Sequence, residues 1–488
     1  MSQTKRIVSK FGGSSMADAT AMHRSAAIVA RQKSTVVVVS ATYGTTNLLV
    51  EAATKSGKGD MALLRPIHDQ IVEKHEAIAN ELGGLDETRK GLKALYDELE
   101  GLMEQLVNRS KTTGRSEPAS GSDPDRKPYD PSETGGTPER TKILELQDAL
   151  YGIGERMSSL LFTECLKSID VSARYFDASI ILRTDERFSK ATPDFNAIEL
   201  LSKAHLEPIV TSEERPTIVT QGFIGSTESG KRTTLGRGGS DYSAAIFAWA
   251  LHADVLEIWT DVGGVATTDP RITPNAKPIS ELSFQEAAEM ATFGAKILHP
   301  STLIPAIWRE IPVYVGSSFN PEEGGTWIYR NVGQAPLVRA ISIRRKQSLL
   351  TITTPEMLHT YGFLYRVFKV FNDHQASVDS ITTSEISVAM TVDDVTLQDQ
   401  ELLRDLEKLG QINIEKSYEL VSVIGNNINH TAGLATIVFD ALSDINVRMI
   451  GQGASKHNFC FLVDEGSGEV AVKRLHAALI ENGDLDQK

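Results

Sequence analysis

The stretch RIVSKFGGSS, residues 6–15, predicts the class of the fold. Its first half is a short strand-like run, a glycine pair follows, and a helical pattern extends from Ser15 to Ala30. Residues 34–40 are apolar on both faces, which is typical of a buried parallel strand. The strand–helix–strand order continues along the chain, so we expect an α/β domain with helices on both faces of a sheet.

Lys10, Gly12 and Gly13 are residue types that suit phosphate binding. Glycines let phosphate oxygens approach backbone N–H groups, and the N-terminal end of the following helix favours negative charge. A lysine at this point can neutralise the charge that builds up during phosphoryl transfer. A tight turn beside a surface lysine has the same sequence, so the motif alone leaves both interpretations open.

The stretch TLGRGGSD, residues 234–241, is the most informative in the chain. Its glycines allow the loop to approach a ligand closely, and the planar guanidinium of Arg237 matches a carboxylate with two hydrogen bonds. Ser240 is expected to cap the helix over residues 242–253. A purely structural glycine turn does not need Arg237 and Asp241 so close together, which favours a binding site.

The stretch WTDVGGV, residues 259–265, predicts a strand that ends in a polar, glycine-rich loop continuing to Arg271. Ligands of open α/β sheets bind at the carboxyl ends of strands. The loop is therefore a candidate nucleotide site, and an ordinary strand-to-loop exit is the alternative.

The stretch FGAKILHP, residues 293–300, places Lys296 late in a helical segment that begins near Phe284. A second lysine at a nucleotide would add charge for the phosphates, whereas a surface lysine is the simpler interpretation. His299 could be a base, but a structural histidine before a proline is favoured.

Residues 225–231 have the spacing of a phosphate-binding P-loop up to Lys231. The next residue is Arg232, where a P-loop needs Ser or Thr for magnesium. A hairpin with a Ser-Gly-Lys turn is therefore the favoured interpretation.

From Ser348 onward the order of elements changes to strand, helix, strand, strand and then repeats. Gly362 and Gly433 are related by the same offset as Phe368 and Phe439. Two related units of this size predict a pseudo-symmetric pair of βαββαβ units, with a seam that can hold a small ligand.

The overall composition excludes several classes of partner. The 488-residue chain has a formal net charge of −14, so it gains nothing from counterion release on a polyanion, and neither nucleic acid nor an anionic membrane surface is expected. Cys165 and Cys460 show no metal or disulfide spacing, and no metal-ligand set is expected from the protein itself. No signal peptide is recognised, and the apolar runs are much shorter than the ~20 residues that cross a bilayer, so a cytoplasmic location is expected.

Residues 108 to about 140 are rich in Ser, Pro, Gly and charge and contain few apolar residues. This composition is typical of a flexible surface insertion. A lid or docking loop is the functional alternative.

Together these motifs resemble the aspartokinase family within the amino acid kinase superfamily, and most closely its monofunctional, lysine-sensitive branch with two ACT domains. The anchors of the resemblance are KFGG at 10–13, GRGGSD at 236–241, WTDV at 259–262 and FGAK at 293–296. The resemblance implies an amino acid kinase fold, an open and mainly parallel sheet between helices, followed by two ACT-like units. It implies a catalytic domain over 1–340 and ACT-like units over 341–418 and 419–488.

The resemblance also implies roles for individual residues. Lys10 and Asp241 would be catalytic. The substrate contacts would be Thr46, Glu155, Arg237, Gly238, Gly239 and Ser240, with Glu155 on the substrate ammonium and Arg237 on its α-carboxylate. The nucleotide contacts would be Lys10, Gly12, Gly13, Ser14, Thr260, Asp261, Ala266, Arg271 and Lys296. The effector contacts would be Met357, Phe363, Leu364, Val378, Asp379, Ser384 and Glu385.

The implied reaction is phosphorylation of the side-chain carboxylate of L-aspartate by ATP with Mg²⁺. L-lysine would inhibit it, and a homodimer or a dimer of dimers is expected. Two departures from the family pattern are Ser14, where Thr is usual, and Ala266, where close relatives carry Tyr.

The sequence disfavours three other functions. Another amino acid kinase, acting on glutamate or N-acetylglutamate, is disfavoured by the paired ACT-like repeats and by Glu155 and Arg237. A catalytically dead amino-acid sensor would have lost kinase residues that are present here. A Rossmann dehydrogenase would need a Gly-x-Gly-x-x-Gly after its first strand, which is absent.

Overall fold

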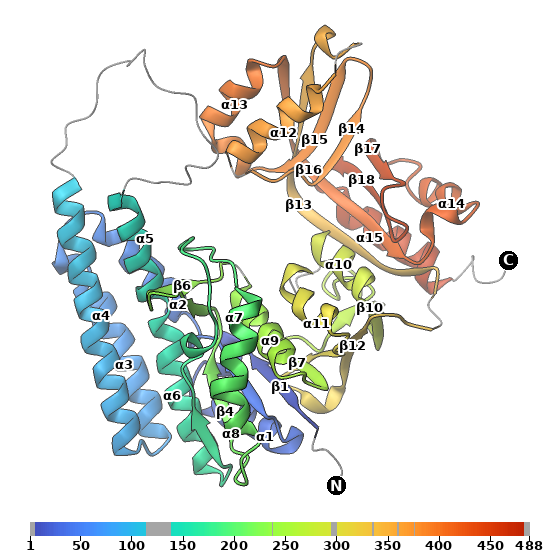
Figure 1. Ribbon diagram of the computed structural model, residues 1–488. Coiled ribbons are helices and arrows are strands. Elements are labelled where there is room, and N and C mark those ends of the chain that lie inside the picture. The colour runs from blue at the N-terminus through green and yellow to red at the C-terminus, as the bar shows by residue number, and fades with distance from the viewer. Residues whose placement is uncertain are drawn as a thin grey trace. The chain divides into compact units, whose positions relative to one another are not determined.

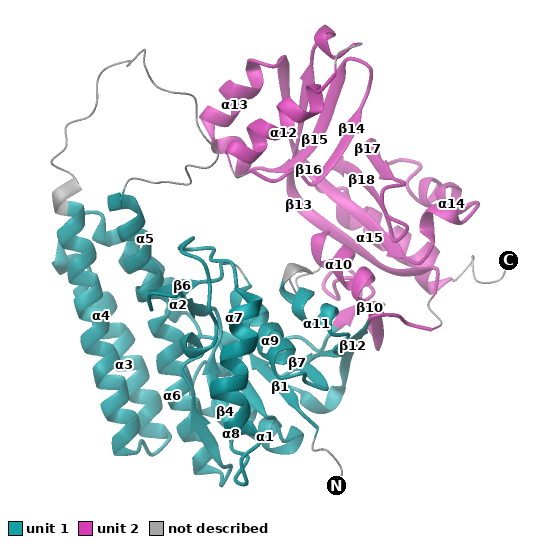
Figure 2. Cartoon of the chain, viewed as in Figure 1, with its two compact units in different colours: residues 1–264, 301–329 teal, residues 265–300, 330–488 magenta. Residues whose placement is uncertain are grey.

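The protein, seen in a computed structural model, is described over residues 5–113, 138–236, 238–293, 300–333, 336–358, 361–374 and 376–482 (Figure 1). It forms two compact units (Figure 2). The first comprises residues 1–264 and 301–329, and the second comprises residues 265–300 and 330–488. No helix in these described ranges is both long and apolar enough to cross a membrane.

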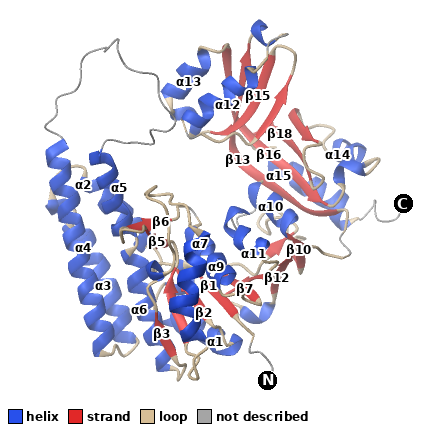
Figure 3. Ribbon diagram, in the orientation of Figure 1, coloured by secondary structure: helices blue, strands red, loops and turns tan. Residues whose placement is uncertain are grey.

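Seven strands of the first unit form one sheet in the order β12-β11-β7-β1-β2-β4-β3 (Figure 3). The strands are β1 (Ile7–Phe11), β2 (Val36–Val39), β3 (Ala173–Tyr175), β4 (Thr217–Gln221), β7 (Val255–Thr260), β11 (Val313–Ser317) and β12 (Gly325–Tyr329). Neighbours are parallel except for the antiparallel pair β11 and β12. β1 and β2 are buried along their whole length, as strands covered by helices on both faces must be. The predicted α/β class is confirmed.

Helices cover both faces of this sheet. α1 (Ala19–Gln32) and α6 (Ile153–Ser168) pack on one face around Phe11 and Val37, and α9 (Gly239–Ala250) packs against β1, β2 and β7 on the other. Outside α6 lies a further layer formed by α2 (Thr45–Ser56), α3 (Arg65–Glu81), α4 (Asp86–Thr113) and α5 (Pro138–Tyr151). The remaining elements of the unit are β5 (Ile224–Ser226), β6 (Arg232–Thr234), α7 (Phe195–Leu201), α8 (Glu207–Val210) and α11 (Ile304–Trp308).

Two local predictions in this unit were wrong. The first long helix begins at Ala19 and not at Ser15, because Asp18 caps it by accepting the N–H of Ala21 at 2.8 Å. A short 3₁₀ turn, Gly13–Met16, precedes it. The predicted insertion is narrower than 108–140, because α4 continues to Thr113 and α5 begins at Pro138; the rest of it lies outside the described residues.

The second unit contains one antiparallel sheet in the order β14-β15-β13-β16-β18-β17. Its strands are β13 (Val338–Thr353), β14 (Ser380–Thr383), β15 (Ser387–Asp393), β16 (Gln411–Gly425), β17 (Val447–Gln452) and β18 (Asn458–Asp464). Its helices include α12 (Phe363–Asp373), α13 (Gln400–Glu407), α14 (Leu434–Ala441) and α15 (Gly468–His476). The predicted pair of ACT-like units is confirmed.

The two ACT-like units interlock. β13 and β16 are long strands that pass through both, because residues 338–344 of β13 pair with 420–425 of β16 while residues 349–353 pair with 411–415. The sequence repeat relates Gly362 to Gly433. Each glycine immediately precedes a helix, and its own backbone is in the left-handed conformation, with φ of 77° and 84°. The expected bounds at 341–418 and 419–488 stay a prediction, since the strand pairing crosses both.

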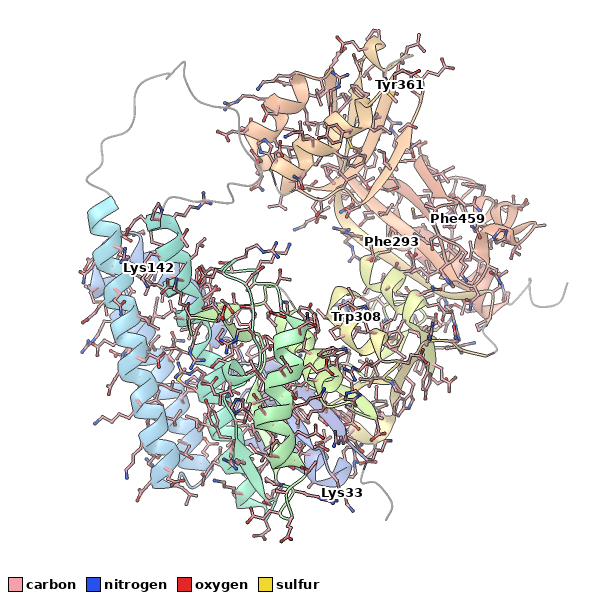
Figure 4. All side chains as sticks on the ribbon, in the orientation of Figure 1. Lys33, Lys142, Phe293, Trp308, Tyr361 and Phe459 are labelled. Carbon is pink, nitrogen blue, oxygen red and sulfur yellow. The ribbon has the colours of Figure 1, made fainter. Side chains whose placement is uncertain are left out.

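The segment 265–300, part of the domain expected over 1–340, lies in the second compact unit, and the expected bound at 340 stays a prediction. It contains β8 (Val265–Ala266), β9 (Pro278–Ile279), β10 (Glu281–Ser283) and α10 (Phe284–Thr292). Ile279, Leu282 and Met290 share a core with Ala340 of β13 and Ile424 of β16, and this packing explains the grouping. Figure 4 labels Phe459, in the core of the second ACT-like unit, and Phe293, which packs against Leu349 and Met449.

Candidate active site

The parallel strands of the first unit bring predicted site residues to one edge of the sheet. Lys10 lies near the end of β1, the loop from Ala41 follows β2, Gly222 follows β4, and Thr260 ends β7. The carboxyl ends of neighbouring parallel strands meet at the same edge, where open α/β sheets bind ligands. The fold therefore gathers residues that are distant in the sequence.

Lys10 forms an ion pair with Asp241, with 2.7 Å between Nζ and Oδ1. Both side chains are largely buried, with exposed fractions of 10% and 18%. Asp241 is the third residue of α9 and so lies in its first turn. The sequence predicted both residues as catalytic, and the structure brings them into contact.

The glycine turn after β1 leaves little room for side chains. A Cβ on Gly13 would lie 3.2 Å from the carbonyl oxygen of Ala41, and one on Gly12 would lie 3.6 Å from Lys10 Nζ. The N–H of Gly12 donates to Trp259 O at 3.2 Å, which ties the turn to β7. Ser14, beside them, is half-buried. This arrangement suits a phosphate beside Lys10.

The second glycine loop joins β6 to α9. Gly236 and Gly238 have φ of 77° and 72°, a conformation that favours glycine. A Cβ on Gly222 would lie 2.6 Å from Cβ of Ser240, so the end of β4 and the start of α9 are in close backbone contact. Arg237, the predicted α-carboxylate clamp, lies outside the described residues. Ser240 is the second residue of α9 and does not cap it, because Gly238 occupies the cap position.

Glu155 is the third residue of α6 and is only 3% exposed. Burial raises its pKa to about 7, although the N–H groups of Glu155 itself and of Ala41 act in the opposite direction. Its Oε2 atom has no hydrogen-bond partner within the described part of the chain. A buried carboxyl group with an unused acceptor is suited to an incoming ammonium group.

Thr46 is exposed in the first turn of α2. The loop before it is fixed by a chain of hydrogen bonds that the sequence did not predict: Thr45 Oγ1 lies 2.6 Å from Thr42 Oγ1, which lies 3.1 Å from Nε2 of the buried His75. The other ring nitrogen, Nδ1, lies 2.7 Å from Ile71 O. Burial lowers the pKa of His75 to about 4, so the ring is neutral and Nδ1–H donates to the carbonyl. A histidine on the apolar face of α3 was the available signal.

Asp148 is a second residue that sequence reasoning missed. It lies fully buried on α5 and accepts the backbone N–H groups of Ser189 and Thr234 and the hydroxyl of Thr234, each at 2.8 Å. Burial raises its pKa to about 6. Thr234 leads directly into the loop that contains Arg237, so Asp148 fixes the start of that loop. A carboxylate among apolar helix positions was the signal.

The predicted nucleotide residues divide between the two units. Thr260 and Asp261 belong to the first, where the Thr260 hydroxyl donates to Asp261 Oδ1 at 3.0 Å. Ala266, on β8, and Arg271 belong to the second. The Arg271 guanidinium is exposed and pairs with Asp269 at 2.6 Å. Lys296 and His299 lie outside the described residues.

The predicted effector residues belong to the first ACT-like unit. Phe363 is buried, Met357 and Val378 pack against the same core, and Leu364 is 38% exposed. Asp379 pairs with Arg344 at 2.7 Å through Oδ1, while its buried Oδ2 has no hydrogen-bond partner in the described ranges. Ser384 and Glu385 are exposed.

No group of three or more His, Cys, Asp or Glu side chains among the described residues could hold a metal ion. A Mg²⁺ ion that arrives on the phosphates of a nucleotide does not need such a cluster, because it keeps waters and takes few protein ligands. The glycine turn and Lys10 therefore fit a nucleotide that brings its own Mg²⁺.

Comparison with known proteins identifies the family. The model of the amino acid kinase family matches residues 5–317, and an ACT domain model matches residues 421–479. Lysine-sensitive aspartokinase 3 of Escherichia coli (strain K12) is 43% identical over 484 residues, covering 97% of this chain and 99% of that protein. Aspartokinase 1, chloroplastic, of Arabidopsis thaliana is 34% identical, covering 98% of this chain and 81% of that protein.

Solved structures agree as well. The crystal structure of E. coli aspartokinase III in complex with aspartate and ADP (R-state) has a TM-score of 0.81 at 42% identity and covers 97% of this chain and 100% of that chain. The complex of the same enzyme with lysine and aspartate (T-state) has a TM-score of 0.78 at 42% identity, covering 98% of this chain and 100% of that chain. The resemblance drawn from the motifs is confirmed: the chain belongs to the aspartokinase family.

Proposed function

We propose that this chain is an ATP-dependent aspartate kinase that converts the side-chain carboxylate of L-aspartate to 4-phospho-L-aspartate. The observation that carries the proposal is the buried Lys10–Asp241 pair beside the glycine turn, with the under-satisfied carboxyl of Glu155 in the same unit. The similar E. coli enzyme was crystallised with aspartate and ADP, the substrate and the nucleotide product that such a reaction requires.

In the proposed reaction an oxygen of the β-carboxylate attacks the γ-phosphorus of ATP, and the bond from that phosphorus to the β,γ-bridging oxygen breaks. The carboxylate is already ionised at pH 7, since its reference pKa is about 3.9. No general base is needed, so catalysis rests on positioning and charge. Lys10 would stabilise the charge on the transferring group, and Asp241 would hold Lys10 in place.

Two further residues would position aspartate. Glu155 would receive the substrate ammonium at its unpartnered Oε2, and Arg237 would bind the α-carboxylate. Mg²⁺ on the nucleotide would neutralise phosphate charge. Thr46 and the residues Gly238, Gly239 and Ser240 remain predicted substrate contacts, as Ser14, Thr260, Asp261, Ala266, Arg271 and Lys296 remain predicted nucleotide contacts.

We also propose that L-lysine inhibits the enzyme by binding at the first ACT-like unit. The unpartnered Oδ2 of Asp379 offers an acceptor for a lysine ammonium group. The similar E. coli enzyme was crystallised with lysine in a T-state, and inhibition requires lysine to bind the less active state more tightly. A homodimer or dimer of dimers, a place as the first step in the biosynthesis of lysine, threonine and methionine, and the cytoplasmic location stay predictions.

An acyl-phosphate trap tests the proposal. Purified protein, ATP, Mg²⁺ and L-aspartate are incubated with hydroxylamine, and aspartyl hydroxamate is measured with and without L-lysine. We expect hydroxamate that decreases with lysine. Hydroxamate formation that is insensitive to lysine would support the kinase activity and exclude lysine as the effector. If a folded, ATP-binding protein formed no hydroxamate, the assignment of aspartate as substrate would be wrong.

A further inference from the structure

A chain of hydrogen bonds in the second unit, buried at Thr267 and His476, joins the predicted nucleotide loop to the C-terminal helix α15. The loop follows β8 and contains Thr267, which is 8% exposed. His476 ends α15 and is fully buried. Thr267 Oγ1 lies 2.8 Å from His476 Nε2, and His476 Nδ1 lies 2.7 Å from Glu481 Oε1.

The chain closes back onto the loop. The side-chain amide of Asn275 donates to Glu481 Oε2 at 2.8 Å. The backbone N–H of Lys277 donates to Thr267 Oγ1 at 2.9 Å, and the N–H of Ile341 on β13 donates to Thr267 O at 2.8 Å. Thr267 is therefore held by Lys277, which precedes β9, by β13 and by α15.

Each ring nitrogen of His476 has a hydrogen-bond partner. Glu481 Oε1 is an acceptor, so His476 Nδ1 carries the proton and donates. Thr267 Oγ1 accepts the N–H of Lys277 and also lies within hydrogen-bond distance of His476 Nε2, so one hydroxyl serves both the loop and the histidine. Both ring nitrogens of His476 and both carboxylate oxygens of Glu481 are used, and the Thr267 hydroxyl is used twice, which favours one defined position of the loop.

A role limited to stability does not account for these residue types. Apolar side chains of similar size fill a buried site at least as well as a polar network, which is advantageous only when it is fully satisfied. A satisfied network of fixed geometry instead specifies where the loop lies. That loop contains Ala266 and Arg271, two predicted nucleotide contacts.

We infer that His476 is a positioning residue for ATP: through Thr267 it holds the nucleotide loop against the second ACT-like unit. The inference rests on the proposed function, because it takes the loop to be part of the ATP site. It gives α15 a role in positioning the nucleotide loop, separate from the proposed aspartate-binding residues Glu155 and Arg237.

Two substitutions of His476 test its hydrogen bonds to Thr267 and to Glu481 separately. In His476→Asn the side-chain amide occupies the place of Nδ1, keeps Glu481 and loses Thr267. In His476→Gln the amide reaches the place of Nε2 and keeps Thr267. Thr267→Val removes the same bond from the other side while keeping the shape, and Thr267→Ser retains the hydroxyl.

We expect His476→Asn and Thr267→Val each to raise the KM for ATP about 3- to 10-fold, the range that one buried hydrogen bond supports. The KM for aspartate should change less than about twofold. Their double variant should be no worse than either alone within about twofold, because both remove one bond. His476→Gln and Thr267→Ser should restore the KM for ATP.

Other outcomes overturn the inference. If both KM values rose in parallel and the melting temperature fell, the hydrogen-bond chain would have only a structural role. Equal effects of Asn and Gln at His476 would show that the bond to Thr267 does not matter for ATP binding. ADP titration by calorimetry separates this test from the proposed function. If the unsubstituted protein makes no hydroxamate, that function fails, while weaker ADP binding by His476→Asn would still support the inference and unchanged ADP binding would overturn it.

Discussion

The two sheets of this protein differ in the direction of their strands and in how they arrange side chains. The sheet of the first unit is mainly parallel, and its strand ends gather Lys10, Thr260 and the loop from Ala41 at one edge. The sheet of the second unit is antiparallel and is shared by two related copies, with β13 and β16 passing through both. Parallel strands bring together different residues for one reaction, whereas a repeated antiparallel sheet presents two similar faces, which suits a sensor.

The two ACT-like copies also differ from each other. In the first copy Tyr361, which Figure 4 labels, is 99% exposed. Tyr365 and Phe368 on α12 are exposed as well. In the second copy Ile437 and Phe439 on α14 pack against the core. The copies therefore share a backbone but not a surface, because α12 of the first leaves large apolar side chains exposed and α14 of the second does not.

Replacing Lys10 should have the largest effect, since it removes the positive charge proposed to stabilise the transferring phosphoryl group. We expect Lys10→Met to lower kcat by about 10²–10³-fold, the range seen when one charge-stabilising group is removed from a transition state. It also leaves Asp241 buried without its partner. Hydroxamate formation at saturating ATP and aspartate measures the effect. A loss under tenfold would contradict a catalytic role for Lys10.

Replacing Glu155 should have the second largest effect on activity. The size of this effect should depend on pH. The ionised carboxylate binds the substrate ammonium, and its pKa is about 7. We therefore expect kcat/KM for aspartate to fall about tenfold per pH unit below pH 7 and to level off above it, because this quantity reports groups of the free enzyme. Glu155→Gln should lower kcat/KM about 10- to 100-fold and remove this step from the profile.

The same substitution should stabilise the protein. The pKa of Glu155 is raised on folding, so its ionised form lowers stability as pH rises from about 4.5 through 7. At pH 8 we expect Glu155→Gln to increase the free energy of unfolding by on the order of 2–3 kcal/mol, and at pH 4 to have little effect. Urea unfolding at both pH values measures this. Equal effects at both would show that burial does not oppose ionisation of this group.

The sequence predicted what depends on local pattern. Val36–Val39 is apolar throughout and forms a buried parallel strand, and Gly362 and Gly433 mark equivalent helix starts because both need a left-handed backbone. Lys10 and Asp241 were predicted from separate motifs, and their contact follows from the sheet order. Family membership came from the combination of such motifs and not from any one of them.

What the sequence missed depends on distant contacts. Asp148, His75 and His476 act through hydrogen bonds to residues far along the chain, and nothing beside them in sequence marks those partners. The helix start at Ala19 was missed because Ser15 and Asp18 both suit a cap, and only the geometry selects Asp18. The interlocked strands were missed because a repeat in sequence does not reveal which half of a long strand pairs with which copy.

Replacing the two repeat glycines tests how far the copies remain equivalent. A Cβ at Gly362 or Gly433 would meet nothing within 4 Å, so the only penalty is the left-handed backbone. We expect Gly362→Ala and Gly433→Ala each to lower the free energy of unfolding by about 1–2 kcal/mol. Urea unfolding of the full chain measures both. A clearly larger effect at one position would mean that the copies no longer share this helix start.

Replacing Lys231 should have the smallest effect, because it tests a resemblance to a phosphate-binding loop that the structure does not support. Lys231 follows the turn between β5 and β6, where its ammonium lies 3.7 Å from Glu145 and 3.8 Å from Glu186 and is 39% exposed. Partly exposed ion pairs of this kind contribute little to stability. The strand β6, and not a helix, follows Gly230, so the backbone there does not form the anion site of a helix N-terminus. We expect Lys231→Met to leave the KM for ATP and kcat within about twofold, in the assay that detects the loss in Lys10→Met. A tenfold rise in the KM for ATP would instead place a phosphate at the β5–β6 turn, and the nucleotide would then not lie at the glycine turn of β1.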